Sequence, residues 1–351
     1  MATVFGDITP TQAAFSYKRV LERATPYEVL GQLGQMKTLP ARSTKTIDFR
    51  RHRLAASANV DAHGAALNHT GFVASEGVTP TAIATTMDSV NVTLAQYIAI
   101  VQWSDIIEDT HIDDVLTEYM GSLGDLAGQI IEFMRWEAIR TGTTFTRLAG
   151  GVGAEASIVA PAGVAEFRAA IRTLRANHAK KIGTLRRAGM QWGSEALESS
   201  FAMVMHTDLE GTVRKVLGAN FTPVADYAPG AQVLVGEFGN FEDVRFISSD
   251  MIGKRANAGA TVAAAPNLFS DNATNVNLYD MVLMGADAWG SIALRGEHAV
   301  TPMLVKARPS DSDPAAQRNK ASIKLLQAAK VLQPAHMVKI VTGAYSDAQL
   351  G

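Results

Sequence analysis

The alternation of apolar and polar positions is clearest between residues 90 and 140, where it predicts one long strand followed by one long helix. Apolar side chains recur at most alternate positions from residue 90 to 103, and five share one face: Val90, Val92, Leu94, Ile98 and Ile100. At about 3.3 Å per residue such a strand spans roughly 45 Å, beyond the usual length. From about residue 110 to 140 the spacing becomes helical, and this helix also spans roughly 45 Å. A long strand beside an equally long helix predicts an elongated slab.

The expected long helix carries a start signal and an unusual set of glycines. Thr110 followed by Asp113 matches a capping box. Gly121, Gly124 and Gly128 fall near one face, although each glycine weakens a helix by about 1 kcal/mol relative to alanine. We therefore expect another stretch of backbone to approach the helix closely there.

The segments before the long strand predict an arm, two short helices and a polar extension. Residues 1–10 show little local order, and a helical pattern then places four residues on one face: Ala14, Tyr17, Leu21 and Ala24. A second short helical pattern begins at Pro26, and residues 45–54 are typical of a strand. Residues 55–89 are rich in small and polar residues with weak periodicity, which is unusual inside a compact domain. We expect them to form an extended hairpin that reaches onto another surface.

The second half of the chain predicts a mixed domain. A helix is expected from Val164 to about Lys181, followed by short β-like runs at residues 201–206, 232–235 and 244–248. A run of apolar and small residues covers 279–294, and a final basic, β-like segment covers 323–341. The whole pattern indicates an α+β fold with mostly antiparallel pairing.

Composition excludes several kinds of site and of location. The chain has 351 residues, 47% of them hydrophobic, and no cysteine, so disulfides, zinc–thiolate sites and cysteine nucleophiles are excluded. Its beginning does not match a secretory signal, and no apolar run of about 18 residues occurs. We expect a soluble protein made in a cytoplasm, with no membrane contact.

The net charge of −2 hides a strong asymmetry. Residues 1–53 hold nine lysines and arginines against four acids, whereas residues 54–134 hold eleven acids and no lysine or arginine. The two blocks could pair within a compact monomer, or between neighbouring copies of an assembling subunit. The charges alone do not decide between these alternatives.

Three groups of residues resemble chemical sites, and each is better explained without one. Gly151 to Ala156 matches the GxGxxA dinucleotide fingerprint, but we expect a loop before it and no helix at it. A cluster of possible metal ligands also suits the start of a helix: Glu108, Asp109, His111, Asp113 and Asp114. His206 and Asp208 lie after three serines without a GxSxG elbow: Ser194, Ser199 and Ser200. We predict no catalytic, cofactor or metal site.

Two basic groups are candidates for contact with partners. Arg50, Arg51 and Arg53 lie on an expected strand, where Arg51 and Arg53 point one way and Arg50 the other. The strongest basic patch has helical spacing and is extended by a basic run: Arg168, Arg172, Arg175, Lys180, Lys181, Arg186 and Arg187. Sequence-specific DNA reading is not expected, because no recognition motif accompanies these residues.

The order of these elements resembles the Hong Kong 97 fold of tailed-phage capsid proteins. Three stretches are similar to motifs of the capsid family typified by the N-four-like podoviruses: residues 236–247 (GEFGNFEDVRFI), 279–290 (YDMVLMGADAWG) and 313–324 (DPAAQRNKASIK). Ser104-Asp105 fits the opening of the spine helix. Asp243 stands where the family pattern has glycine, and Ile323 where an aromatic residue is typical. The resemblance covers most of residues 5–345.

This resemblance implies a non-enzymatic major capsid protein without cofactors, forming pentamers and hexamers of an icosahedral head around double-stranded DNA. It implies five parts: an N-terminal arm (1–40), a peripheral domain with the spine helix (41–53 and 90–162), an E-loop (54–89), a mainly axial domain (163–300) and a C-terminal segment that returns to the peripheral domain (301–351). Implied partners are copies of the chain, a portal, scaffold or decoration proteins and non-specifically packaged DNA, all in a virion made in a bacterial host.

The E-loop would lie on one neighbouring subunit and the arm would cross another. We expect nine residues at such contacts: Arg50, Arg51, Arg53, Asp61, Glu76, Asp88, Arg168, Arg172 and Arg175. Two other functions remain open at this stage, an encapsulin-like shell that holds a protein cargo and a soluble α+β hydrolase that uses His206 and Asp208.

Overall fold

A computed structural model provides the structure of the chain. It describes residues 28–39, 44–61, 65–79, 82–110, 115–186, 194–227, 233–294, 300–309 and 315–350. The arm at residues 1–27 and the residues of the expected capping box beyond Thr110 therefore lie outside the described part. Among the described residues, no helix is both long and apolar enough to cross a membrane.

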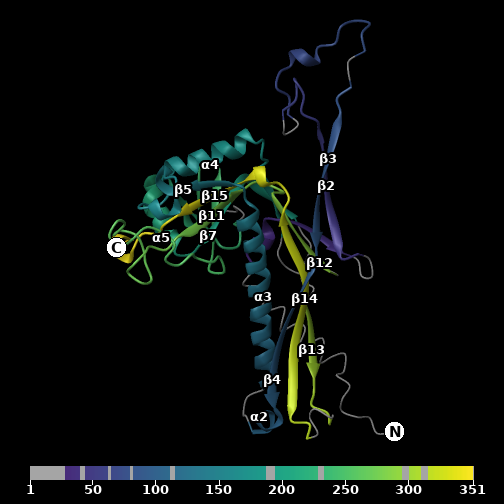
Figure 1. Cartoon of the computed structure of the whole chain (residues 1–351), viewed down its shortest axis with the longest axis vertical. Coiled ribbons are helices and arrows are strands. Elements are labelled where there is room, and N and C mark those ends of the chain that lie inside the picture. Colours follow the sequence, from purple (N-terminus) through teal and green to yellow (C-terminus); the bar gives the residue numbers. More distant parts are fainter. Residues whose placement is uncertain are drawn as a thin grey trace.

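A long helix packed on a sheet forms the elongated part of the molecule (Figure 1). Helix α3 runs from Val115 to Gly142, next to the short helix α2 (Asp105–Thr110). The sheet has the order β1-β12-β14-β13, and β4 also pairs with β14. Its strands are β1 (Gln35–Leu39), β4 (Ala95–Ser104), β12 (Trp289–Leu294), β13 (Val300–Val305) and β14 (Arg318–Val331). The expected helix is thus confirmed at nearly its full length.

Apolar side chains of α3 join the helix to this sheet. Met120, Leu123, Ala127 and Ile131 pack against β14 in a core that also contains Ile323. Gly121, Gly124 and Gly128 are buried as well. They lie on the side of α3 next to this apolar stripe, so no side chains project from these three positions.

The expected single strand at residues 90–103 is wrong in one respect. It is divided at Leu94 into β3 (Thr85–Thr93), which pairs with β2 (Thr46–Leu54), and β4, which pairs with β14. Because side chains alternate along a strand, a one-residue interruption moves all later residues to the other face. Val92 is buried, whereas Ile98 and Ile100 are exposed.

A rounded lobe lies beside one end of α3 and contains an eight-stranded sheet (Figure 1). Its order is β5-β15-β11-β7-β10-β9-β8, and β6 pairs with β7. The strands are β5 (Phe145–Leu148), β6 (Ile182–Arg186), β7 (Ser194–His206), β8 (Thr222–Pro223), β9 (Glu237–Phe241), β10 (Val244–Ser249), β11 (Tyr279–Met284) and β15 (Met337–Thr342). The lobe's helices are α4 (Val164–Ala176), α5 (Leu209–Leu217) and α6 (Asp347–Leu350).

The chain crosses between the two sheets twice through short connections. Residues 279–294 form β11 in the lobe and β12 beside α3, and residues 318–342 form β14 beside α3 and β15 in the lobe. The C-terminal segment therefore returns to the elongated part only up to Val331. Each of these two stretches is continuous in the sequence pattern but breaks at the boundary between the sheets.

The hairpin β2–β3 carries residues 55–84 away from both sheets (Figure 1). Residues 66–79 are exposed throughout. The expectation that this segment does not fold into the body of its own subunit is confirmed for residues 66–79, whereas Asp61 contacts His178 of the lobe.

Candidate inter-subunit surfaces

The arginines of the hairpin already have acidic partners in their own chain. Arg51 lies opposite Asp88 in the β2–β3 register, and its Nη2 is 3.1 Å from Asp88 Oδ2. The Nε of Arg53 is 3.0 Å from the same oxygen. Arg50 points to the other face, where it lies 3.7 Å from Asp48. The structure places this part of the charge complementarity within one chain, and contact of these residues with a neighbouring subunit stays a prediction.

The far end of the hairpin exposes apolar side chains together with one acid. Leu67 is 60% exposed, Val73 72% and Val78 65%, and Glu76 lies among them. Asp61, nearer the base, accepts a hydrogen bond from Ala65 N and lies 3.3 Å from His178. We call residues 65–79 the loop tip. Covering these apolar side chains with another surface would be favourable, because it would remove them from water.

A second exposed surface lies on the long sheet, on the side opposite α3. Ile98 and Ile100 of β4 are 55% and 63% exposed, and Met303 and Val305 of β13 are 45% and 59% exposed. Between them on β14 lie Lys320 and Lys324, because Ile98 pairs with Lys324 and Val305 with Lys320. We call these six residues the sheet face. It combines apolar area with positive charge, whereas the loop tip combines apolar area with negative charge.

The basic residues of α4 are partly neutralised by the turn between β9 and β10. Arg168 Nε lies 2.8 Å from Glu242, and Arg175 and Lys181 both pair with Asp243. The hydrogen bond from Lys181 has the largest effect on Asp243 and lowers its pKa, and the hydrogen bond from Arg175 lowers it further. Arg172 is exposed between these pairs. On this face of α4, the exposed Arg172 lies between arginines that are paired with acids. Contact of the patch with a neighbouring subunit stays a prediction.

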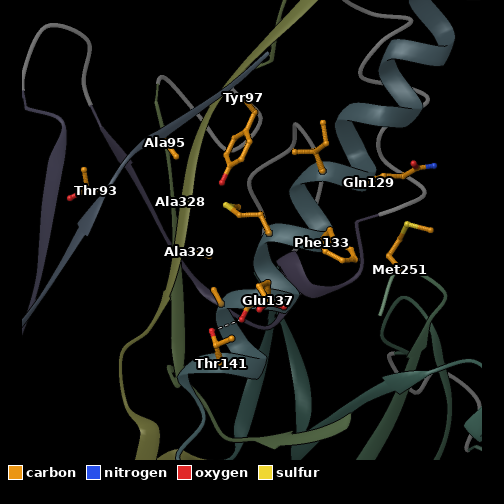
Figure 2. Close-up of a pocket in the computed structure, with 13 residues that line it drawn as sticks. Thr93, Ala95, Tyr97, Gln129, Phe133, Glu137, Thr141, Met251, Ala328 and Ala329 are labelled. Carbon is orange, nitrogen blue, oxygen red and sulfur yellow. Dashed lines mark hydrogen bonds between the residues drawn. The ribbon is translucent and has the colours of Figure 1, made fainter. Parts of the chain in front are cut away.

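An apolar groove of about 810 Å³ opens where α3 leaves the long sheet (Figure 2). Phe133 and Gln129 of α3 line one wall, and Tyr97 of β4 lines the other. Beyond this point α3 packs on the lobe instead, through Trp136 and Ile139. The groove thus marks the joint between the elongated part and the lobe.

Three buried charged residues attach the N-terminal segment to α3. Arg135 Nη1 lies 3.0 Å from Glu28 and 3.8 Å from Glu132. Glu132 Oε1 accepts hydrogen bonds from the backbone of Val29 and Leu30, at 3.1 and 2.8 Å. All three charged side chains are at most 1% exposed. Two carboxylates share one guanidinium, so one negative charge would remain if both were ionised. Burial raises the pKa of Glu132 to about 7, against the opposing effect of Arg135.

The raised pKa of Glu132 predicts that subunit stability falls as pH rises. The folded protein holds a proton that the unfolded chain releases above pH 4.5, so this contribution is complete below 4.5 and is lost as pH rises through about 7. Between pH 5 and 8 the loss amounts to about 3 kcal/mol. Urea unfolding of unassembled Glu132→Gln should show a flatter pH dependence by this amount. Glu137→Gln, a half-exposed position on the same helix, should keep the wild-type slope; an equal flattening in both variants would contradict the prediction.

His206 and Asp208 are close together but do not form a hydrolase triad in the described structure. His206 Nδ1 lies 3.4 Å from Asp208 Oδ1, and burial lowers the histidine pKa. The other carboxylate oxygen accepts a hydrogen bond from Tyr279 at 2.8 Å. Among described residues, no serine hydroxyl is a partner of His206. The pair stabilises the end of β7 against β11.

The remaining chemical candidates gain no support. A strand, β5, does precede Gly151, contrary to expectation, but two short 3₁₀ turns follow it and α4 begins only at Val164. In the expected metal cluster, His111, Asp113 and Asp114 lie outside the described residues. Within the described part, no group of three potential ligands is suitable for a metal ion.

Comparison with protein families decides among the remaining interpretations. The model of a family described as phage capsid protein matches residues 86–340, which include α3, the long sheet apart from β1, and most of the lobe. The chain belongs to this family. A comparison with curated proteins finds no match.

Solved capsids share the fold of this capsid protein at low sequence identity. The capsid of Ralstonia phage GP4 is 13% identical with a TM-score of 0.62, covering 90% of this chain and 88% of the other. The capsid of cyanophage P-SCSP1u is 15% identical with a TM-score of 0.55, covering 91% and 88%. The head protein of Helicobacter pylori bacteriophage KHP40 is 10% identical with a TM-score of 0.55, covering 91% and 89%. The expected capsid fold is confirmed.

The motifs that suggested the family occupy constrained positions in the capsid protein. Gly236 has a φ of 78°, and a Cβ there would lie 2.7 Å from the carbonyl oxygen of Ser248. In the turn after β9 the positive φ of 51° falls on Glu242, so Asp243 needs no glycine conformation. Asp243 instead forms ion pairs with Arg175 of α4 and with Lys181. The departure from the family pattern is thus compatible with the turn.

The sequence reasoning missed two features of the capsid protein. The sheet face was assigned to the wrong side of its strand, because the interruption at Leu94 leaves no mark in the alternation. The buried charged group of Glu28, Glu132 and Arg135 was missed because Glu28 and Arg135 are 107 positions apart. A carboxylate and an arginine inside otherwise apolar patterns, at Glu132 and Arg135, were the available signal.

Proposed function

We propose that this capsid protein is the major shell subunit of a tailed phage and assembles into pentamers and hexamers around double-stranded DNA. The observation that supports the proposal is the pair of surfaces left uncovered in one chain, the loop tip and the sheet face. In this proposal the loop tip of one subunit, as its E-loop, rests on the sheet face of the next. The apolar side chains then cover one another, and Glu76 approaches Lys320 and Lys324.

The proposal assigns parts of the shell to parts of the fold. Helix α3 and the long sheet form the peripheral domain, and the lobe forms the axial domain near the symmetry axis of each capsomer. Of the nine charged residues expected at contacts, six lie on the hairpin and its loop, and Arg168, Arg172 and Arg175 lie on α4. The proposal places both groups at contacts with neighbouring subunits. A portal, scaffold or decoration proteins and the packaged DNA would complete the head.

Electron microscopy of the purified chain tests the proposal directly. We expect rings of five and six subunits or closed shells, because every copy carries both surfaces of the contact. A concentrated sample that contains only single subunits would contradict the assembly proposal. Shells that enclose a protein cargo and no DNA in the native particle would favour an encapsulin-like function.

Mature particles should contain no covalent links from lysines of the loop. The sequence has no lysine between Lys45 and Lys180, so the E-loop has no amine for an isopeptide bond with a neighbour. Denaturing electrophoresis of mature particles should show one band near 37 kDa. A ladder of multimers that resists boiling in detergent would show that another residue supplies a cross-link.

A further inference from the structure

Residues 28–39 cross the joint between the elongated part and the lobe, and we call them the latch. At one end, Arg135 of α3 holds the Glu28 carboxylate, and Glu132 accepts backbone hydrogen bonds from the next two residues of the latch. At the other end, β1 pairs in parallel with β12. Within the described sheets β1 has no second partner. It is therefore an edge strand that can leave without breaking any other strand pair.

The middle of the latch covers the apolar core of the joint. Its single 3₁₀ turn (Leu30–Gln32) is buried. The core beneath it contains Trp136 of α3 and Trp289 of β12. The Gln32 side chain exchanges two hydrogen bonds with the backbone of Val235 in the lobe, at 2.8 and 3.0 Å. One short turn and one short strand thus close a core that α3, the long sheet and the lobe share.

The charged attachment of the latch contains one more carboxylate than cations. Glu28 and Glu132 share Arg135, and all three side chains are buried. Among the described residues, Arg135 of α3 and Glu28 of the latch are the charged groups that act on Glu132, and its Oε2 has no hydrogen-bond partner there. The other charged residue of the latch, Lys37, is exposed on β1. A negative charge on Glu132 therefore favours a state in which water reaches it.

The sign of the pH response follows from this burial. Burial raises the pKa of Glu132 to about 7, and exposure to water would return that pKa towards its usual 4.5. The closed latch holds a proton that an open latch releases. The contribution of this proton to closure is complete below pH 4.5 and is lost as pH rises through about 7.

From these observations we propose that residues 28–39 are a pH-sensitive latch, closed over the joint while Glu132 is protonated and opening locally when Glu132 ionises. Local opening means that the latch detaches while both sheets remain folded. Its contacts lie within one chain, so the latch does not rest on the proposed assembly and can be tested on unassembled subunits.

Hydrogen exchange measured by mass spectrometry tests the latch between pH 5 and 8. After correction for intrinsic exchange rates, the opening of residues 28–39 should increase in the wild type on the order of 100-fold across this range. In Glu132→Gln, which keeps the acceptor oxygen but cannot ionise, opening should change less than about threefold. The control Glu137→Gln, on the same helix, should respond like the wild type. An equal increase in Glu132→Gln would overturn the proposal.

Exchange of β11 separates local opening from unfolding of the whole subunit. This strand is buried throughout, so its amides exchange when the lobe unfolds. At every pH the latch should open at least about tenfold more often than β11. Equal opening of the two segments would mean that the latch detaches only in the unfolded subunit, and would exclude it as a local device.

Glu28→Gln provides a second variant, because it leaves Arg135 with a single carboxylate. The Glu28 charge raises the pKa of Glu132 and Arg135 lowers it, so this pKa should fall in the variant. The pH at which opening stops increasing should therefore be lower than in the wild type, in subunits that circular dichroism shows to be folded. An unchanged or higher value would contradict a latch controlled by the shared arginine.

Discussion

Replacing Ile98 and Ile100 together with aspartate is expected to abolish shell assembly and leave the subunit folded. Both side chains are more than half exposed in the single chain, so the fold loses little apolar burial. The carboxylate introduced at position 98 would lie opposite Lys324 in the β4–β14 register, where opposite charges stabilise a strand pair. In the proposed contact the two isoleucines are covered, and each contributes about 1.5 kcal/mol or more. Their loss therefore weakens each contact at least about 100-fold.

Light scattering and electron microscopy would measure the loss of shells, and circular dichroism would confirm the fold. The matched control is Val159→Asp, an apolar position that is 49% exposed but lies outside the sheet face. Charge exchange gives a sharper test: Glu76→Lys and Lys324→Glu should each reduce assembly, and the double variant should recover part of it. Normal shells from the Ile98→Asp/Ile100→Asp variant would exclude the sheet face as a contact.

Replacing Arg135 with methionine should destabilise the subunit by about 3–5 kcal/mol, because removing one partner of a buried ion pair leaves charge without compensation. Here Glu28 and Glu132 would both lose their cation while remaining buried. Methionine has a similar length, so the loss of packing is small. Chemical unfolding of unassembled subunits at pH 8, where Glu132 is ionised in the wild type, gives the largest difference.

The exposed pair of Arg168 and Glu242 provides the comparison. Arg168→Met should cost less than about 1 kcal/mol, as is typical of surface ion pairs. Adding Glu28→Gln and Glu132→Gln to Arg135→Met should recover part of the stability, because the uncompensated charges are then removed. If the triple variant were no more stable than Arg135→Met alone, lost packing and not buried charge would explain the effect.

Local patterns predicted the elongated architecture because its main elements are long and strongly periodic. The helix around residues 115–142 has an apolar stripe at helical spacing, which a strand pattern does not reproduce. The polar extension after Leu54 has too few apolar residues to form a core of its own. The order of these elements, together with short motifs such as that at residues 236–247, was enough to indicate the capsid fold.

The boundaries between the sheets could not be predicted, because they depend on partners distant in sequence. Leu94 continues the alternation of both β3 and β4, and only the pairing with β14 shows where the face changes. The apolar run at residues 279–294 likewise gives no sign that its halves belong to different sheets. The charge pairing could not be predicted either, because it is the hairpin register that places Arg51 opposite Asp88.

The two short connections between the sheets have a mechanical consequence. Residues 285–288 and 332–336 lie side by side, since the backbone N–H groups of Leu332 and Gln333 both donate to Ala288 O. Together they resist twisting of the lobe, because twisting would break these hydrogen bonds. Helix α3 is a third connection, since it packs on the long sheet through Leu123 and on the lobe through Trp136 and Ile139. Three connections at one joint hold the lobe and the elongated part in a fixed relative orientation.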